Sequence, residues 1–265
     1  MGARTLFGRR VIYADVIEIN DNNIIDVLQK ALFTHLMNQA DINYLYRYYK
    51  GDQPILYRKK DVRPEINNKV VENRANEIVS FKVGYLMGEP VQYVSRKDDK
   101  GIAEAVTRLN DYTLSEDKPS EDAELAEWWH ICGTSYRMVL PDGEADLEED
   151  EAPFEIYTLD PRFAFVVYST ALGNPPIMGV KYVLKDDGVL VFSCYTDDHF
   201  YEVENTWTIR RSEEQYLGIP IIEYPANKSR LGAFEIVLPL LDAINTTESN
   251  RIDGVEQFIQ SLMLF

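Results

Sequence analysis

The spacing of apolar side chains changes at Gly133, and this change limits the folds that the chain can adopt. Before Gly133, apolar residues recur every three or four positions, which is typical of helices that bury one face. After it come short runs rich in β-branched and aromatic residues, separated by turn residues, which predict strands. The expected strands are 135–140, 154–159, 163–168, 178–184 and 189–195, two more within 201–211, and a last one at 220–223. The turn residues Lys185 to Gly188 are expected to join two antiparallel strands. The sequence therefore predicts an α+β fold that combines helices with antiparallel strands.

The helical region divides at residues that favour helix ends. Asp21 is expected to cap a first helix that begins near Asn22, and Asp41 a second helix that ends before Gly51. Further helices are expected at 70–86, 101–112 and 120–132, with a short strand at 91–95. The apolar run 11–19 near the N-terminus is expected to need another part of the molecule to hold it.

A long helix is expected from Pro239 to Leu264, because the segment has no turn cluster and proline suits a first helical turn. It would span about 39 Å at 1.5 Å per residue. One side of it is an apolar seam, formed by Leu241, Ile244, Ile252, Val255, Ile259 and Leu262. The other is a polar face, formed by Asp242, Asn245, Ser249, Asp253, Glu256 and Gln260. The last residues are apolar and lack a cap, so we expect the polypeptide to continue beyond Phe265.

Composition disfavours several classes of protein. The chain has 27 Lys and Arg against 44 Asp and Glu, a net charge of -17, and such a surface repels the phosphates that a conventional nucleic-acid reader binds. The charge is typical of a soluble protein surface, and it would also suit a channel wall along which DNA moves without binding. Cys132 and Cys194 are too few for a disulfide scaffold and are expected to be reduced and buried. No apolar stretch predicts a membrane span or a signal peptide, so the protein is expected in the cytoplasm when made.

The motifs of common enzymes and cofactor sites are absent from the sequence. It has no glycine-rich phosphate loop, dinucleotide fingerprint or nucleophile elbow. His35, His130 and His199 form no metal-binding pair, so neither a metal nor a cofactor is expected. The acidic stretch Glu144–Glu151 lacks the spacing of a calcium loop and is expected to be a solvated hairpin tip. The tyrosines within 44–49 are expected to pack in a core, because few basic residues accompany them for stacking on bases.

Several motifs keep an order and spacing that carry a family resemblance over about residues 40 to 262. They are Tyr44, Tyr48, Tyr49, Lys50-Gly51-Asp52, Asn67-Asn68, Tyr85, Gly88 and Pro90, then Gly133-Thr134-Ser135-Tyr136, Leu159-Asp160-Pro161, Gly218-Ile219-Pro220 and Leu241-Asp242-Ala243. Together these residues resemble the portal proteins, or head-to-tail connectors, of long-tailed double-stranded DNA bacteriophages.

The resemblance implies an N-terminal arm at 1–20, a wing domain at 21–231 and a first stem helix at 232–265. The wing would be helical over 21–133 and β-rich over 134–231, while the clip, second stem helix and crown of the portal fold would lie outside these residues. A ring of twelve subunits is implied at one capsid vertex of the virion, assembled in the host cytoplasm. Double-stranded DNA would pass through it, without sequence specificity, during packaging and ejection.

The implied partners are further copies of the chain, the terminase packaging motor, the major capsid and scaffolding proteins and the head-completion or adaptor protein, with no enzymatic activity. In such a ring the polar face of the long helix is expected to line the channel, and the apolar seam to pack against neighbouring subunits. Two alternatives remain open. One is a capsid-associated or scaffold-binding structural protein without a channel, and the other is an enzyme whose site the sequence does not reveal.

Overall fold

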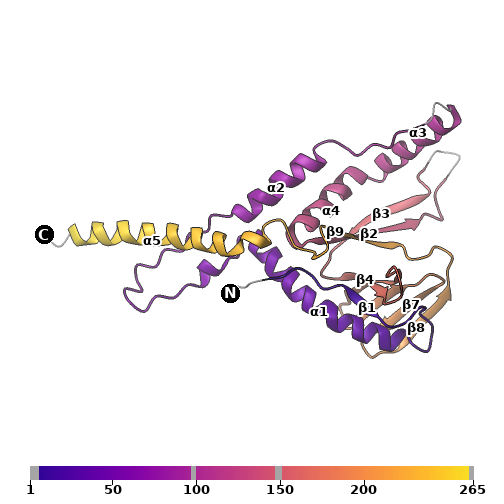
Figure 1. Cartoon of the computed structure of the whole chain (residues 1–265), viewed down its shortest axis with the longest axis horizontal. Helices are drawn as coiled ribbons and strands as arrows, with labels where there is room; N and C mark the ends of the chain where they lie inside the picture. Colours follow the sequence, from indigo (N-terminus) through magenta and orange to yellow (C-terminus); the bar gives the residue numbers. More distant parts are fainter. Residues whose placement is uncertain (1–5, 97–99, 147–150, 263–265) are drawn as a thin grey trace.

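Two sheets and a group of helices form the body of the molecule, and one long helix projects from it (Figure 1). The computed structural model describes residues 6–96, 100–146 and 151–262. The mixture of helices and mainly antiparallel strands confirms the predicted α+β class. Within the described residues, none of the helices combines the length and the apolar character needed to span a membrane.

The larger sheet has six strands in the order β1-β4-β5-β6-β7-β8. They are β1 (Ile12–Ala14), β4 (Ala164–Ser169), β5 (Pro176–Leu184), β6 (Leu190–Tyr195), β7 (His199–Glu204) and β8 (Ile209–Glu214). β1 runs parallel to β4, and all other neighbours are antiparallel. The predicted turn between β5 and β6 is confirmed, because the Gly188 amide donates to the Lys185 carbonyl at 2.9 Å and Gly188 has a φ of 82°.

The smaller sheet places β2 (Thr134–Pro141) between β3 (Phe154–Leu159) and β9 (Ile221–Pro225), both antiparallel to it. The two sheets share a small core in which Met138 and Ile221 pack with Val166. The acidic stretch 144–151 lies in the connection between β2 and β3, as a hairpin tip would. Its residues 147–150 lie outside the described part of the chain.

One continuous helix, α1 (Ile24–Tyr49), replaces the two helices predicted over this stretch. No glycine or proline interrupts it, so the backbone hydrogen bonds continue past Asp41, which lies inside the helix instead of capping a new one. The helix ends where the sequence indicated. Gly51 has a φ of 92°, which favours glycine, and the Lys50 amide donates to the Tyr46 carbonyl at 3.0 Å.

Three further helices follow, α2 (Arg74–Met87), α3 (Lys100–Ser115) and α4 (Lys118–Cys132). α2 begins later than predicted, because the Asn73 side chain caps it by accepting from the Asn76 amide. The strand predicted at 91–95 is wrong. The Tyr93 amide donates to Oδ1 of Asn110 at 2.9 Å and its carbonyl accepts from Nδ2 at 3.0 Å. One side chain from α3 thus satisfies both backbone groups of Tyr93, which a neighbouring strand would otherwise pair.

The helix α1 takes part in two separate hydrophobic cores. Its first half contributes Leu28 to a core with Phe165 and other side chains of the larger sheet. Its second half contributes Tyr48 to a core with Trp128 of α4 and Phe234. Tyr44, Tyr48 and Tyr49 are buried, which confirms that these rings pack in the core. A helix from the helical half of the sequence therefore packs against the sheet that the β-rich half forms.

The start of the chain is tied to the far end of the sequence. β1 pairs with β4, and Arg9 forms a buried ion pair with Glu235 at 2.6 Å. Glu235 belongs to a short 3-10 helix, η2 (Glu235–Val237), and also accepts from the amides of Gly8 and Gly232 at 3.0 and 2.9 Å. These contacts attach the apolar N-terminal run to the rest of the molecule, as expected.

The two cysteines are both buried and free, as the sequence indicated. Burial raises the pKa of the Cys132 thiol to about 12 and raises that of Cys194 as well. Neither thiol is therefore ionised near neutral pH.

Candidate functional site

The projecting helix α5 (Leu238–Leu262) begins inside the molecule. Leu238 and Leu241 are buried in the same core as Tyr48 of α1. The Tyr48 hydroxyl donates to Oδ1 of Asp242 at 2.9 Å. Burial raises the pKa of Asp242, and this hydrogen bond offsets part of the rise. The first turns of α5 are thus anchored in the body, while the rest extends away from it (Figure 1).

One side of α5 is covered by residues 53–73, which we call the strap. The strap includes the 3-10 helix η1 (Pro54–Tyr57) and leads into α2. Nδ2 of Asn245 donates to Oε1 of Gln53, and Oδ1 of Asn245 accepts from the Glu72 amide at 2.9 Å. One turn later, Oγ of Ser249 accepts from the Val70 amide at 3.0 Å. The side chains of Asn245 and Ser249 therefore satisfy backbone and side-chain groups of the strap.

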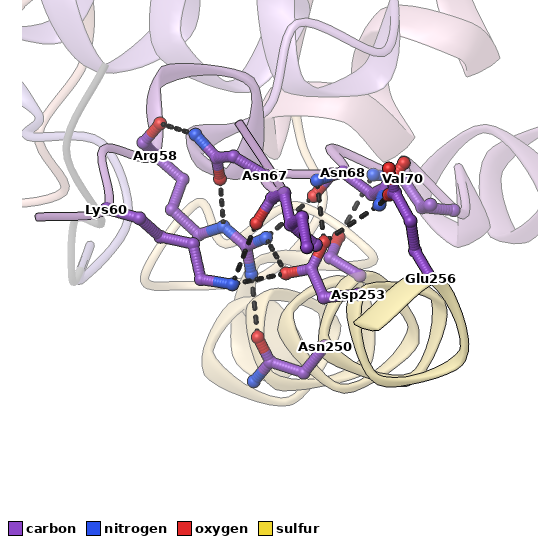
Figure 2. A network of polar contacts seen from close by, with 10 residues as sticks. Arg58, Lys60, Asn67, Asn68, Val70, Asn250, Asp253 and Glu256 are labelled. Carbon is purple, nitrogen blue, oxygen red and sulfur yellow. Dashed lines mark hydrogen bonds and ion pairs between the residues drawn. The ribbon is translucent and has the colours of Figure 1, made fainter. Parts of the chain in front are cut away.

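The strongest contact between the strap and α5 is made by Asp253 (Figure 2). Its Oδ2 lies 2.7 Å from Nη2 of Arg58 and 2.7 Å from Nζ of Lys60, and its Oδ1 accepts from the amide and Nδ2 of Asn68 at 2.8 and 2.9 Å. Only 2% of Asp253 is exposed. Burial alone would raise its pKa, but the hydrogen bonds from Lys60, Asn68 and Arg58 outweigh it and hold the pKa well below its usual range.

Arg58 extends this network to both sides of Asp253. Its Nε donates to Oδ1 of Asn67 at 3.0 Å, its Nη1 to Oδ1 of Asn250 at 2.8 Å, and its Nη2 to the Asn68 carbonyl at 2.8 Å. Nδ2 of Asn68 also donates to Oε2 of Glu256 at 2.9 Å (Figure 2). One guanidinium therefore orders the strap and joins it to α5 at the same time.

Another side of the distal part of α5, next to the one that the strap covers, is an exposed apolar surface, which we call the outer stripe. It consists of Ile252, Val255, Phe258 and Ile259, which are 42, 57, 64 and 48% exposed. Nothing among the described residues covers it. Four large apolar side chains on two successive turns form a contiguous patch of the kind that marks an interaction surface.

The structure places the predicted polar face in a different environment from the one expected. Asn245 and Ser249 have no exposed surface and Asp253 has 2%, so these three side chains are enclosed by their own chain and do not face water. This corrects their expected position at a channel wall. Asp242 and Glu256 are half-buried, and Gln260 is exposed.

The predicted apolar seam divides into two parts. Leu241 and Ile244 pack into the core of their own chain. Ile252, Val255 and Ile259 belong to the exposed outer stripe, to which Phe258 adds the most exposed side chain. The side chain of Leu262 lies outside the described part of the structure.

The strap was not predicted from the sequence. Arg58 and Lys60 received no role there, and Asn68 entered only as part of a family motif. A usable signal was present in the spacing of Asn245, Ser249 and Asp253, because polar residues four positions apart on one helix face can meet a polar segment as well as water.

The contacts at this site hold the strap and α5 together. Within residues 6–96, 100–146 and 151–262, no three His, Cys, Asp or Glu side chains are placed to hold a metal ion. The basic side chains Arg58 and Lys60 already have a partner, because both are paired with Asp253. The site therefore positions a helix and presents its outer stripe.

Comparison with known proteins identifies the family of the chain. The family model described as "Phage portal protein, SPP1 Gp6-like" matches residues 19–264, which is nearly the whole chain. No curated protein matches the sequence. The matched region contains α1 to α5, β2 to β9 and the strap, and on this match the chain belongs to the SPP1 Gp6-like family of phage portal proteins.

Proposed function

We propose that this portal protein forms a closed ring at one vertex of the capsid. Each subunit would contribute its α5 to the wall of the ring. The observation that carries the proposal is the outer stripe, four exposed apolar side chains on a helix whose neighbouring side is already fixed by the strap. A second copy of the chain is the occupant that fits, because the family is oligomeric. A contact between two different surfaces of identical subunits closes into a ring when the rotation allows it.

The proposed ring is the conduit for double-stranded DNA in packaging and ejection. A net charge of -17 disfavours strong phosphate contacts, which would hold the duplex in place. Of the residues expected at the channel wall, Asp242, Glu256 and Gln260 keep some access to solvent, and we retain the role for these three. The proposed ring has twelve subunits. It docks the terminase motor, contacts the capsid and scaffolding proteins and binds the adaptor protein.

The ring is tested by imaging and by mass measurement of the purified protein. Particles with a central hole and a mass of many subunits are expected. Replacing Val255 and Phe258 by Glu should shift the mass towards the monomer, because the outer stripe would then carry charge into the contact. The matched control is Leu172→Glu, at a fully exposed loop residue between β4 and β5. Solid particles without a hole would instead favour a capsid-associated protein without a channel.

The conduit is tested by adding positive charge to the proposed channel wall. Glu256→Lys should slow DNA packaging in an assembled system, because each added cation gives the duplex a phosphate contact. Asp187→Lys makes the same charge change at the exposed turn between β5 and β6 and should leave packaging unchanged. Equal packaging by both variants would remove Glu256 from the channel wall.

A further inference from the structure

The strap has an outward face that its own chain leaves exposed. Arg58 has an extended backbone, and both Arg58 and Lys60 point towards α5, where they bind Asp253 (Figure 2). Successive side chains of an extended segment point to opposite sides, so the exposed Lys59 points away from α5. Large apolar side chains at the surface can mark an interaction surface. Those of the strap are Leu56, Tyr57 and Val62, which are 37, 47 and 79% exposed.

The strap and the outer stripe lie at the same height along α5 (Figure 1). Arg58 binds Asn250 and Asp253, and Asn68 binds Asp253 and Glu256. The residues of the outer stripe, 252, 255, 258 and 259, belong to the same turns of the helix. A residue of the stripe is therefore within about 5 Å, measured along the helix axis, of a residue that the strap binds.

The symmetry of a ring brings these two surfaces together, and this step rests on the proposed function. A rotation about the ring axis keeps each atom at its height along that axis. The outer stripe of one copy therefore meets what the next copy presents at the same height, which is either the strap or the remaining side of α5. That remaining side offers no large apolar surface, because it carries Gly254, Gln257 and Ser261. The outward face of the strap offers three large apolar side chains.

The charges of the two surfaces are complementary. The strap, residues 53–73, has five Lys and Arg against three Asp and Glu, whereas α5 has four Asp and Glu against one Arg. Lys59 and Arg63 are exposed and form no ion pair among the described residues. On α5, Glu248 lies one turn before Ile252 of the stripe, and Arg251 is 3.7 Å from it. A basic strap and an acidic helix favour contact between different surfaces over contact between two stripes.

We infer that the outer stripe of one subunit packs on the outward face of the strap of the next subunit. The occupant of the stripe is thus a second copy of this chain, and the strap connects successive α5 helices. Its inward cations fix it to its own helix, while its outward apolar side chains receive the neighbouring helix. The contact joins two different surfaces, so it repeats from subunit to subunit and closes into a ring.

Cross-linking tests which surfaces meet. Two variants are co-expressed, one with Val62→Cys in the strap and one with Arg251→Cys beside the outer stripe, and the assembled protein is treated with a short bismaleimide. A covalent dimer of one copy of each is expected on a denaturing gel. Cys132 and Cys194 are buried and do not compete for the reagent. Leu172→Cys in place of Val62→Cys is the matched control and should give no dimer.

A substitution in the strap tests the contribution of the contact. Val62→Asp should raise the concentration at which half of the subunits are assembled about tenfold, which corresponds to 1.4 kcal/mol. The subunit itself should keep its circular dichroism spectrum, because Val62 is 79% exposed. Val62→Ile keeps the apolar surface and should assemble as the parent protein does. Leu172→Asp makes a similar change in the loop between β4 and β5 and should leave assembly unchanged.

Two results would overturn the inference while the ring stands. One is a ring with a central hole in which the Val62→Cys and Arg251→Cys copies do not link, because the strap would then lie away from the stripe. The other is efficient linking of Arg251→Cys copies to each other, which would mean that stripe meets stripe. A parent protein that forms no ring would overturn the proposed function and this contact together, and imaging of the parent separates that failure from the first two.

Discussion

Asp253 of α5 and Arg58 of the strap are 195 positions apart in the sequence, and their side chains meet at 2.7 Å. Lys60 reaches the same carboxylate oxygen, so one acidic side chain holds two cations and the backbone of Asn68. This relationship fixes the side of α5 that its own chain covers, and thereby the side that is left for a neighbouring subunit.

Replacing Asp253 by Asn should destabilise the protein by about 2–3 kcal/mol. Removing one member of a buried pair leaves the partner charges without compensation, and this value is below the range for fully buried pairs because Arg58 and Lys60 keep 16 and 25% exposure. Urea unfolding at pH 7 measures the change. The control is Glu248→Gln, whose exposed pair with Arg251 should contribute less than about 0.5 kcal/mol. Equal effects of the two substitutions would show that the strap is held by other contacts.

The contribution of Asp253 should depend on pH in one direction. Its pKa is lower in the folded protein than in the unfolded chain, so the stabilisation is fully present above the unfolded value of about 3.9 and is lost as the pH falls through the folded value. The difference in unfolding free energy between the parent and Asp253→Asn should therefore be constant from pH 7 to about pH 5 and shrink below about pH 4. A difference that grew on acidification would contradict the lowered pKa.

Gly133 should not tolerate a side chain. It ends α4 with a φ of 77°, and an added Cβ would lie 2.2 Å from the Arg230 carbonyl oxygen. Gly133→Ala should cost at least about 2 kcal/mol, because alanine is strained in this backbone region before any collision is counted. Gly143→Ala is the comparison, since nothing lies within 4 Å of its added Cβ. A thermal midpoint of Gly133→Ala equal to that of Gly143→Ala would mean that the end of α4 is free to move.

The two thiols should not react with Ellman's reagent until the protein unfolds. Cys132 and Cys194 are buried, and burial raises the pKa of both, so neither offers an exposed thiolate to Ellman's reagent. We expect no reaction in the native protein at pH 8 and two equivalents per chain in denaturant. Rapid reaction of one native thiol would place that cysteine at the surface.

The strands that follow Gly133 were predictable to within three residues because their signals are local. The run 154–159 coincides with β3, and the residues Lys185 to Gly188 form the turn expected of them. The errors of element type or number came from contacts that no local pattern contains. The strand β1 was not predicted, and it exists through its pairing with β4. Asn110 replaces a strand partner for residues near Tyr93, and an uninterrupted backbone carries α1 past Asp41.

The position of the site was predictable, but the surroundings of its side chains were not. Periodicity identified α5 and separated its polar from its apolar side. It could not distinguish a polar face that meets water from one that meets a polar segment of the same chain, because both need the same residue types. Asn245 and Ser249 are hydrogen-bonded to a segment more than 170 positions away, and that partner leaves no trace in the spacing of α5.

The sharing of α1 between two cores has a mechanical consequence. Its 26 residues form a rod of about 39 Å that touches the root of α5 at one end and the six-stranded sheet at the other. A torque applied to α5 would reach the distant sheet through this single stiff lever, with no loop in between to absorb it.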